Sequence, residues 1–257
     1  MGFGGRGGPK PPKKPLPPGQ RYAIIAGAIV VLVAVLLRSN RIDRTDVIYF
    51  CVLVPSIIIH EMSHGVVALA FGDDTAKRAG RLSLNPIRHI DPVGTLLVPG
   101  VLSLAGFGAY GWAKPVPVNP ARMRSPRNDS VIVSLAGPLT NFALAAVLGV
   151  IFVATSPAAL RQSFYETGNL NFLSFGDQVV FIAGFANILL GLFNLIPCPP
   201  LDGAALLERL LPARVLPEYY QLQPFLMFLP FLLILIFHSQ WSELLGHVIN
   251  WYAGLLA

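Results

Sequence analysis

A run of five residues has the types and spacing that predict a metal site. His60, Glu61 and His64 lie in the run His-Glu-Met-Ser-His. On a helix, residues four apart lie one turn apart on the same face, so both imidazoles can reach a single Zn²⁺. Glu61 would then lie beside the metal, where its carboxylate can accept a proton from a metal-bound water. These residues therefore predict hydrolysis by a zinc-activated water with Glu61 as the general base.

A third metal ligand must come from elsewhere in the chain, because a catalytic zinc usually has three protein ligands and one position for water. The other histidines lie in a basic loop or beside polar residues, where ordinary surface roles account for them: His89, His238 and His247. The better candidate is Asp202. It lies in the segment Asn194–Gly203, where three prolines interrupt any helix and leave the carboxylate free to face a cavity. Capping of a following helix, Ala204–Leu211, is an alternative role that is compatible with ligation.

The composition places these residues in a membrane protein. Hydrophobic residues make up 54% of the 257 residues and charged residues only 12%, whereas soluble domains have about 25% charged residues. This excludes an ordinary cytosolic enzyme and a disordered chain. Ionisable side chains inside an apolar span are costly and are functional by default. We therefore expect an all-α polytopic membrane protein, with about five to six transmembrane helices.

Hydropathy and length define the expected segments. A hydrocarbon core about 30 Å thick needs about 20 helical residues. The expected spans are Tyr22–Leu37, Val47–Phe71, Ser130–Thr155, Val179–Pro197 and a last one that begins with Phe225–Phe237. Residues 1–21, rich in glycine, proline and lysine, predict a flexible basic tail. Residues 22–257 are expected to form a single membrane domain, with a core of 47–211 and accessory helices at 22–37 and 225–256.

The distribution of basic residues predicts the orientation. Lys and Arg concentrate in cytoplasmic loops, so their excess over Asp and Glu, 19 against 13, indicates topology and not a nucleic-acid partner. The apolar segment Val93–Tyr110 is broken by proline and glycine. If it is re-entrant, fifteen basic residues lie inside and four outside. We therefore expect a re-entrant hairpin there, a cytoplasmic N-terminus and a site that opens toward the cytoplasm. A tilted true span also fits the hydropathy.

Brief alternation over Arg81–Asp91 predicts a small β-hairpin at the cytoplasmic surface. Such a hairpin would have a use if the substrate is a helix, because a helical substrate must unwind before its peptide bonds are accessible. Extended backbone can then be held by pairing with an exposed strand edge. Our hypothesis is that this hairpin or the re-entrant segment offers the edge.

Two motifs together resemble those of the site-2 protease family of intramembrane zinc metalloproteases. These are His60-Glu61-x-x-His64 in one span and Asn-x-x-Pro-x-Pro-x-Leu-Asp-Gly over 194–203 at the end of a later span. Ala-Gly-Pro-Leu-Thr-Asn over 136–141 supports the resemblance. So does Gly-Trp-Ala-Lys-Pro-Val-Pro-Val-Asn-Pro over 111–120, which looks like a segment of compact prokaryotic members without a PDZ insertion.

The resemblance, which covers about residues 47–211, implies the following roles. His60, His64 and Asp202 hold one Zn²⁺ per chain, and Glu61 activates the water. The substrates are transmembrane proteins in the lipid bilayer, and the chain is a multi-pass protein of a prokaryotic cell membrane. Asparagines of the family act near the substrate, which nominates Asn141 and Asn194 for positioning the substrate strand or the transition state. A helix cap is the other role open to Asn194.

A membrane metal transporter or a non-catalytic metal-binding membrane protein is the alternative class. A transporter is expected to have polar residues along several consecutive spans, whereas the first, fourth and last expected spans are nearly bare of them. Glu61 distinguishes the classes, because Glu61→Gln should leave zinc bound and abolish proteolysis. Zinc transport that persisted in that variant, with no peptidase activity in the parent, would favour the transporter.

Overall fold

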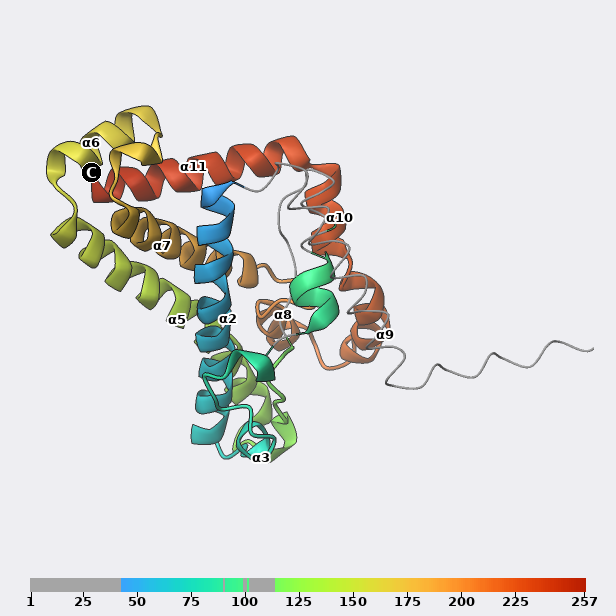
Figure 1. Cartoon of the computed structure of the whole chain (residues 1–257). Coiled ribbons are helices and arrows are strands. Elements are labelled where there is room, and N and C mark those ends of the chain that lie inside the picture. Colours follow the sequence, from blue (N-terminus) through green and yellow to red (C-terminus); the bar gives the residue numbers. More distant parts are fainter. Residues whose placement is uncertain (1–42, 90, 99–100, 102–113) are drawn as a thin grey trace, which may run out of the picture.

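The computed structural model describes residues 43–89, 91–98, 101 and 114–257, and these residues form helices and no strand (Figure 1). The tail 1–21, the expected span 22–37 and most of the expected re-entrant segment 93–110 lie outside the described residues. The helical fold class is confirmed for the described part of the chain.

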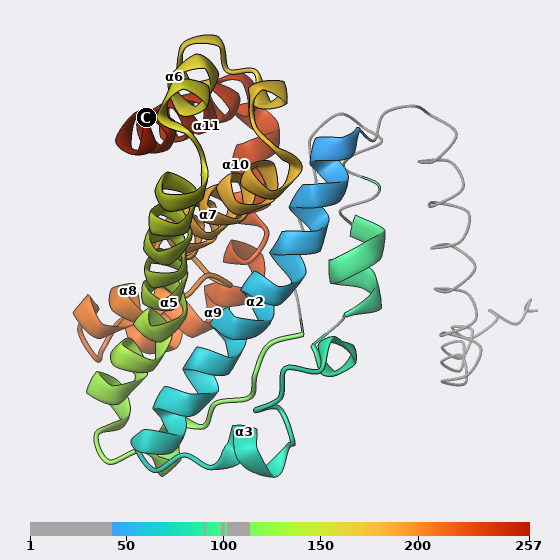
Figure 2. The ribbon, with the colours of Figure 1, turned by 60° about the vertical axis from the view of Figure 1, so that its left-hand side comes forward.

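Three long helices form the centre of the fold. They are α2 (Arg44–Ala70), α5 (Pro126–Thr155) and α7 (Phe175–Asn194). Each is long and apolar enough to cross a membrane, and no other helix of the described residues meets both criteria. The three helices pack against one another, as both ribbon views show (Figures 1 and 2). The spans expected at Val47–Phe71, Ser130–Thr155 and Val179–Pro197 are therefore confirmed as helices.

Local sequence signals fix where α2 begins and ends. Asp43 caps the helix, since its Oδ1 accepts from the Asp46 amide at 2.8 Å, and Asp46 Oδ2 accepts from the Asp43 amide at 3.0 Å. This reciprocal capping satisfies backbone donors that the first turn leaves free. The helix ends before Gly72, which adopts a φ of 104°, a conformation that residues with a Cβ rarely adopt.

The connection from α2 to α5 contains only short helices and one extended segment. The described residues of Arg81–Asp91 form the 3₁₀ turn η1 (Pro86–Arg88) in place of the expected β-hairpin. Pro86 has no N–H for a strand ladder, and the Asn85 side chain accepts from the Ile87 amide at 3.0 Å, which favours a turn. The described residues of 81–91 therefore do not supply the expected strand edge.

The remaining parts of this connection follow in chain order. They are α3 (Thr75–Arg78) before η1, then the π-helical turn η2 (Pro92–Leu97), and η3 (Pro120–Arg122). Asp91 caps η2 by accepting from the amides of Val93 and Gly94. An extended segment, 114–119, precedes η3 and leads toward α5.

The chain after α7 is divided into short helices and one longer one. These are α8 (Ala204–Leu210), α9 (Leu216–Leu226), α10 (Leu229–Ile236) and α11 (His238–Leu256); α6 (Ala158–Thr167) links α5 to α7. The last span, expected to begin with Phe225–Phe237, is not formed as one helix. Pro230 lies in this run, in the first turn of α10, and has no N–H to donate to the preceding turn. Pro224 precedes the run and lies inside α9. Figure 1 shows α11 running crosswise at the end of the bundle where α2 begins.

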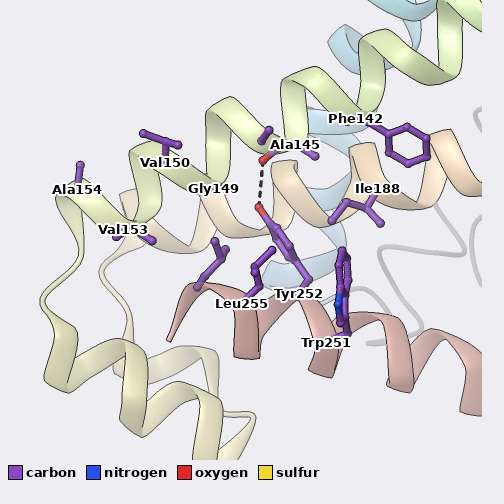
Figure 3. Close-up of a pocket in the computed structure, with 12 residues that line it drawn as sticks. Phe142, Ala145, Gly149, Val150, Val153, Ala154, Ile188, Trp251, Tyr252 and Leu255 are labelled. Atoms are coloured by element: carbon purple, nitrogen blue, oxygen red, sulfur yellow. Dashed lines mark hydrogen bonds between the residues drawn. The ribbon is translucent and has the colours of Figure 1, made fainter.

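Two regions at that end of the molecule are formed mainly by apolar and aromatic side chains. Aromatic rings form one core, with centroids 4.8 Å apart for Phe164 and Phe181 and 5.3 Å apart for Phe181 and Tyr252. Beside this core is a cavity of about 610 Å³, shown in Figure 3, which is lined by side chains of α5, α7 and α11. These contacts hold α5, α7 and α11 together at this end of the bundle.

Candidate metal centre

The fold brings His60, His64 and Asp202 together. His60 and His64 lie one turn apart on α2, and their Nε2 atoms are 3.1 Å apart. Asp202 lies in the turn after α7, with Oδ2 at 3.0 Å from His60 Nε2 and Oδ1 at 3.3 Å from His64 Nε2. One ligand atom from each of the three residues fits within 4.8 Å of the others. The structure thus brings together the two histidines and the aspartate that were nominated as ligands, although Asp202 lies far from them in the sequence.

The outer nitrogen of each imidazole is bound to an oxygen that can only accept. His60 Nδ1 contacts Asn141 Oδ1, and His64 Nδ1 lies 2.7 Å from the Val133 carbonyl oxygen. An acceptor oxygen requires that the facing nitrogen carry the hydrogen, so both rings are assigned the Nδ1–H tautomer. The Nε2 lone pairs are then directed at one another and at Asp202, which is the arrangement of metal-binding histidines.

The donor set fits a divalent cation. Two Nε2 lone pairs and a carboxylate converge, and none of these atoms has a hydrogen to give to another. Within the described residues, Asp202 Oδ2 is buried and has no hydrogen-bond partner. Buried acceptors that face one another are costly unless a positive charge lies between them. Two imidazoles and one carboxylate are ligands suited to Zn²⁺.

A glycine allows α5 to approach the two rings. A Cβ placed on Gly137 would lie 2.5 Å from His60 Cε1, His60 Nε2 and His64 Nε2. No side chain larger than hydrogen fits there without moving both rings. The role of Gly137 in the run 136–141 is therefore to leave room for the two imidazole rings.

Backbone contacts in the turn after α7 position Asp202. The Gly203 amide donates to the Asn194 carbonyl at 2.7 Å, and a Cβ on Gly203 would lie 2.3 Å from the Leu195 carbonyl oxygen. The alternative role of Asp202 as a helix cap is not seen, because no side chain caps the start of α8. Asn194 Nδ2 donates within α7, to the Leu190 carbonyl at 2.9 Å. The structure therefore brings Asp202 into the cluster, whereas the Asn194 amide nitrogen bonds to its own helix.

Glu61 is held by the extended segment 114–119. Its Oε2 accepts from the Val116 amide at 2.7 Å. The segment itself is fixed at both ends. Arg81 Nη2 donates to the carbonyls of Lys114 and Pro115, and the Asn119 amide donates to Asp73 Oδ2 at 2.6 Å. The candidate general base thus has a defined partner on a segment that runs alongside α2.

Asp73 anchors this segment at the end of α2. Burial alone would raise the pKa of the Asp73 carboxyl, but the hydrogen bonds from the amides of Asn119 and Thr75 and from the Thr75 hydroxyl favour the charged form. Together with the nearby charge of Arg122, they place the pKa of Asp73 below its ordinary value. The carboxylate therefore stays ionised and continues to accept the hydrogen bond from the Asn119 amide.

Sequence reasoning missed two polar residues behind His60. Asn187 Oδ1 accepts from Asn141 Nδ2 at 2.7 Å, and Asn187 Nδ2 donates to Ser56 Oγ at 2.9 Å. A single asparagine inside an apolar span was the signal that could have found Asn187. The surface role expected for His89 is wrong, because it is 2% exposed and Nε2 bonds to the Ser83 carbonyl. His238 and His247 are exposed as expected.

Two histidines and an aspartate with converging lone pairs, next to a glutamate on an apolar helix, define a membrane metallohydrolase. Comparison with known proteins agrees, because the family model described as Peptidase family M50 matches residues 48–237. The chain belongs to peptidase family M50. No solved structure matches it.

Three relatives are named as zinc metalloproteases. YwhC of Bacillus subtilis is 43% identical over 63% of this chain and 68% of its own length. Rip2 of Mycolicibacterium smegmatis is 30% identical over 71% of this chain and 64% of its own length. MJ0392 of Methanocaldococcus jannaschii is 23% identical over 71% of this chain and 39% of its own length. The match thus spans about two thirds of the first two relatives.

Proposed function

We propose that this protein is an intramembrane zinc metalloprotease that hydrolyses peptide bonds within or near transmembrane segments of other membrane proteins. His60, His64 and Asp202 hold the zinc, and Glu61 is the general base. The observation that carries this proposal is the convergence of two Nε2 lone pairs and the Asp202 carboxylate beside Glu61, at the junction of three apolar helices. The family assignment and the names of the relatives support it.

The protein side chains have separate roles in the hydrolysis. A zinc ion bound by the three ligands would supply Lewis-acid activation of the peptide carbonyl and of the attacking water. Glu61 takes the proton of that water and later returns it to the leaving nitrogen. Its Oε2 is held by the Val116 amide, which keeps the carboxylate at a fixed position. Asn141 holds the His60 ring in place through its contact with Nδ1, and we assign Asn194 to positioning the substrate.

We place the site toward the cytoplasm of a prokaryotic cell membrane. Basic residues gather near the end of α2 that follows His64 and near the start of α5: Lys77, Arg78, Arg122, Arg124 and Arg127. Positive charge concentrates on the cytoplasmic side. Residues 22–257 then act as one membrane domain, with a core of 47–211 and the basic tail 1–21 on the same side.

The test compares the parent with Glu61→Gln, reconstituted with a transmembrane peptide substrate. Glutamine cannot accept the proton, so cleavage should fall by at least about 100-fold, as for loss of a general base. Zinc content should stay at one per chain. Glu243→Gln, an exposed change on α11, is the matched control and should cleave normally. Cleavage that survives Glu61→Gln, or zinc uptake into vesicles without cleavage by the parent, contradicts the proposal.

A further inference from the structure

A continuous chain of hydrogen bonds runs behind His60 and links all three central helices. It begins on α2, where Ser56 Oγ donates to the Val52 carbonyl at 2.8 Å. Asn187 on α7 donates to Ser56 Oγ at 2.9 Å and accepts from Asn141 Nδ2 on α5 at 2.7 Å. Asn141 Oδ1 then contacts His60 Nδ1, back on α2. The chain therefore starts and ends on α2, one helical turn apart.

The three side chains of this chain of hydrogen bonds are buried. Asn141 is 0% exposed, Asn187 is 1% exposed and Ser56 is 5% exposed. A buried amide that lacks a partner is costly, so each of these groups is confined to the orientation in which its donors meet acceptors. A network of this kind acts as a unit when every member is satisfied.

The orientation of the whole chain is set at one backbone carbonyl. Asn187 Nδ2 also donates to the Ala183 carbonyl at 2.9 Å, within α7. A carbonyl can only accept, so the Asn187 nitrogen must face it and the Asn187 oxygen must face α5. That oxygen in turn requires the nitrogen of Asn141, which leaves the oxygen of Asn141 for His60. An acceptor at this position requires a hydrogen on His60 Nδ1.

We propose that Asn187 is a positioning residue for the metal site. Through Asn141, it holds His60 in the Nδ1–H tautomer, with the Nε2 lone pair directed toward His64 and Asp202. The inference rests on the proposed metal site. It applies to His60 alone, since His64 Nδ1 faces the Val133 carbonyl and needs no help from this chain. Partners that orient a ligating histidine typically contribute about 10–100-fold to metal affinity.

The experiment measures zinc affinity of the full chain by competition with a chromophoric chelator. Asn187→Leu removes both the donor and the acceptor and should weaken zinc binding by about 10–100-fold. Asn187→Ala, a smaller side chain that also lacks the acceptor for Asn141 Nδ2, should weaken zinc in the same way if the leucine variant does not fold. Ser56→Ala should change the affinity by less than about threefold, because Ala183 still orients Asn187.

Gln178→Met is the matched control for a general loss of stability. Gln178 is also a buried amide on α7, and its Nε2 donates to the carbonyls of Leu170 and Leu173, outside the chain of hydrogen bonds to His60. Its substitution should leave zinc affinity unchanged. Asn187 variants that bind zinc within threefold of the parent, or a Gln178 variant weakened as much, would overturn this inference alone. A parent that binds no zinc would overturn the proposed metal site as well.

Discussion

The two halves of α5 show how one helix meets two different demands. Its first half faces the histidines of the candidate metal centre, with Gly137 against both imidazoles and Asn141 bonded to His60. Its second half, from Ala145 to Ala154, lines the apolar cavity that α11 helps to close (Figure 3). Each half has one glycine at a close contact, Gly137 in the first and Gly149 in the second.

The difference lies in what each glycine contacts. At Gly137 the neighbours are imidazole rings fixed by hydrogen bonds on their far sides. At Gly149 the neighbours are the ends of Leu256 and Tyr252, at 3.1 and 3.5 Å from a Cβ placed there. The ends of flexible side chains can yield by a few tenths of an ångström, whereas the two imidazole rings cannot move without breaking these hydrogen bonds. Packing around the first half of α5 therefore requires fixed atomic positions, whereas packing around the second half requires only that the volume be filled.

The largest expected effect tests this contrast directly with Gly137→Ala and Gly149→Ala. The first should lower cleavage of a transmembrane peptide by at least about 100-fold, since a displacement near 1 Å has that effect on a catalytic group. It should also weaken zinc binding. The second should cleave within about twofold of the parent, although overpacking can cost about 1–3 kcal/mol of stability. Equal losses in both variants would remove the distinction.

Adding or removing zinc should change the thermal stability through the candidate metal centre and not through the apolar cavity. Zinc at 100 times its dissociation constant stabilises the folded state by about 2.7 kcal/mol. Thermal unfolding of the parent should shift upward on zinc addition, and that of Asp202→Asn should not. Tyr252→Phe removes only the hydroxyl that donates to Ala145 on the cavity side, so it should keep the full zinc shift. A shift in Asp202→Asn would show that zinc binds elsewhere.

A smaller loss is expected at the extended segment beside Glu61. Val116→Pro removes the N–H that donates to Glu61 Oε2, whereas Val116→Ala keeps it. A hydrogen bond to a charged group is worth about 1.5–3 kcal/mol, so kcat should fall by about tenfold or more in the proline variant. KM and zinc content should stay unchanged. If the alanine variant loses as much kcat, the side chain matters and the amide does not.

The smallest effect concerns pH and the anchor at Asp73. Its folded pKa is lowered, so its contribution to stability is present above the unfolded value of about 3.9 and is lost as pH falls through the folded value. Parent and Asp73→Asn should therefore differ in unfolding midpoint at pH 6 and converge below about pH 3.9. Denaturant unfolding in detergent at a series of pH values measures this. A difference that persists unchanged in acid would assign the effect to packing.

Much of the central fold was predictable because it depends on local patterns. Long apolar runs predict α2, α5 and α7, and two histidines one turn apart predict a shared metal. The prolines before Asp202 pointed to its carboxylate. The role of Asn187 was not predicted, because a hydrogen bond between α5 and α7 leaves no spacing signal in either helix. The described residues of 81–91 form no β-hairpin, because their alternation is outweighed by the turn that Asn85 and Pro86 favour.

The turn that carries Asp202 has a consequence for the order of biogenesis. Two of the three central helices, α5 and α7, lie between His64 and Asp202 in the chain. An ion held by the proposed ligands would therefore act as a cross-link that closes a long loop, and this cross-link could form only after the whole loop had been synthesised and packed. Until α7 and its turn are in place, the nascent chain has two histidines and a glutamate but no complete centre. On the proposed ligand set, the metal site is complete only when these helices have been synthesised and packed.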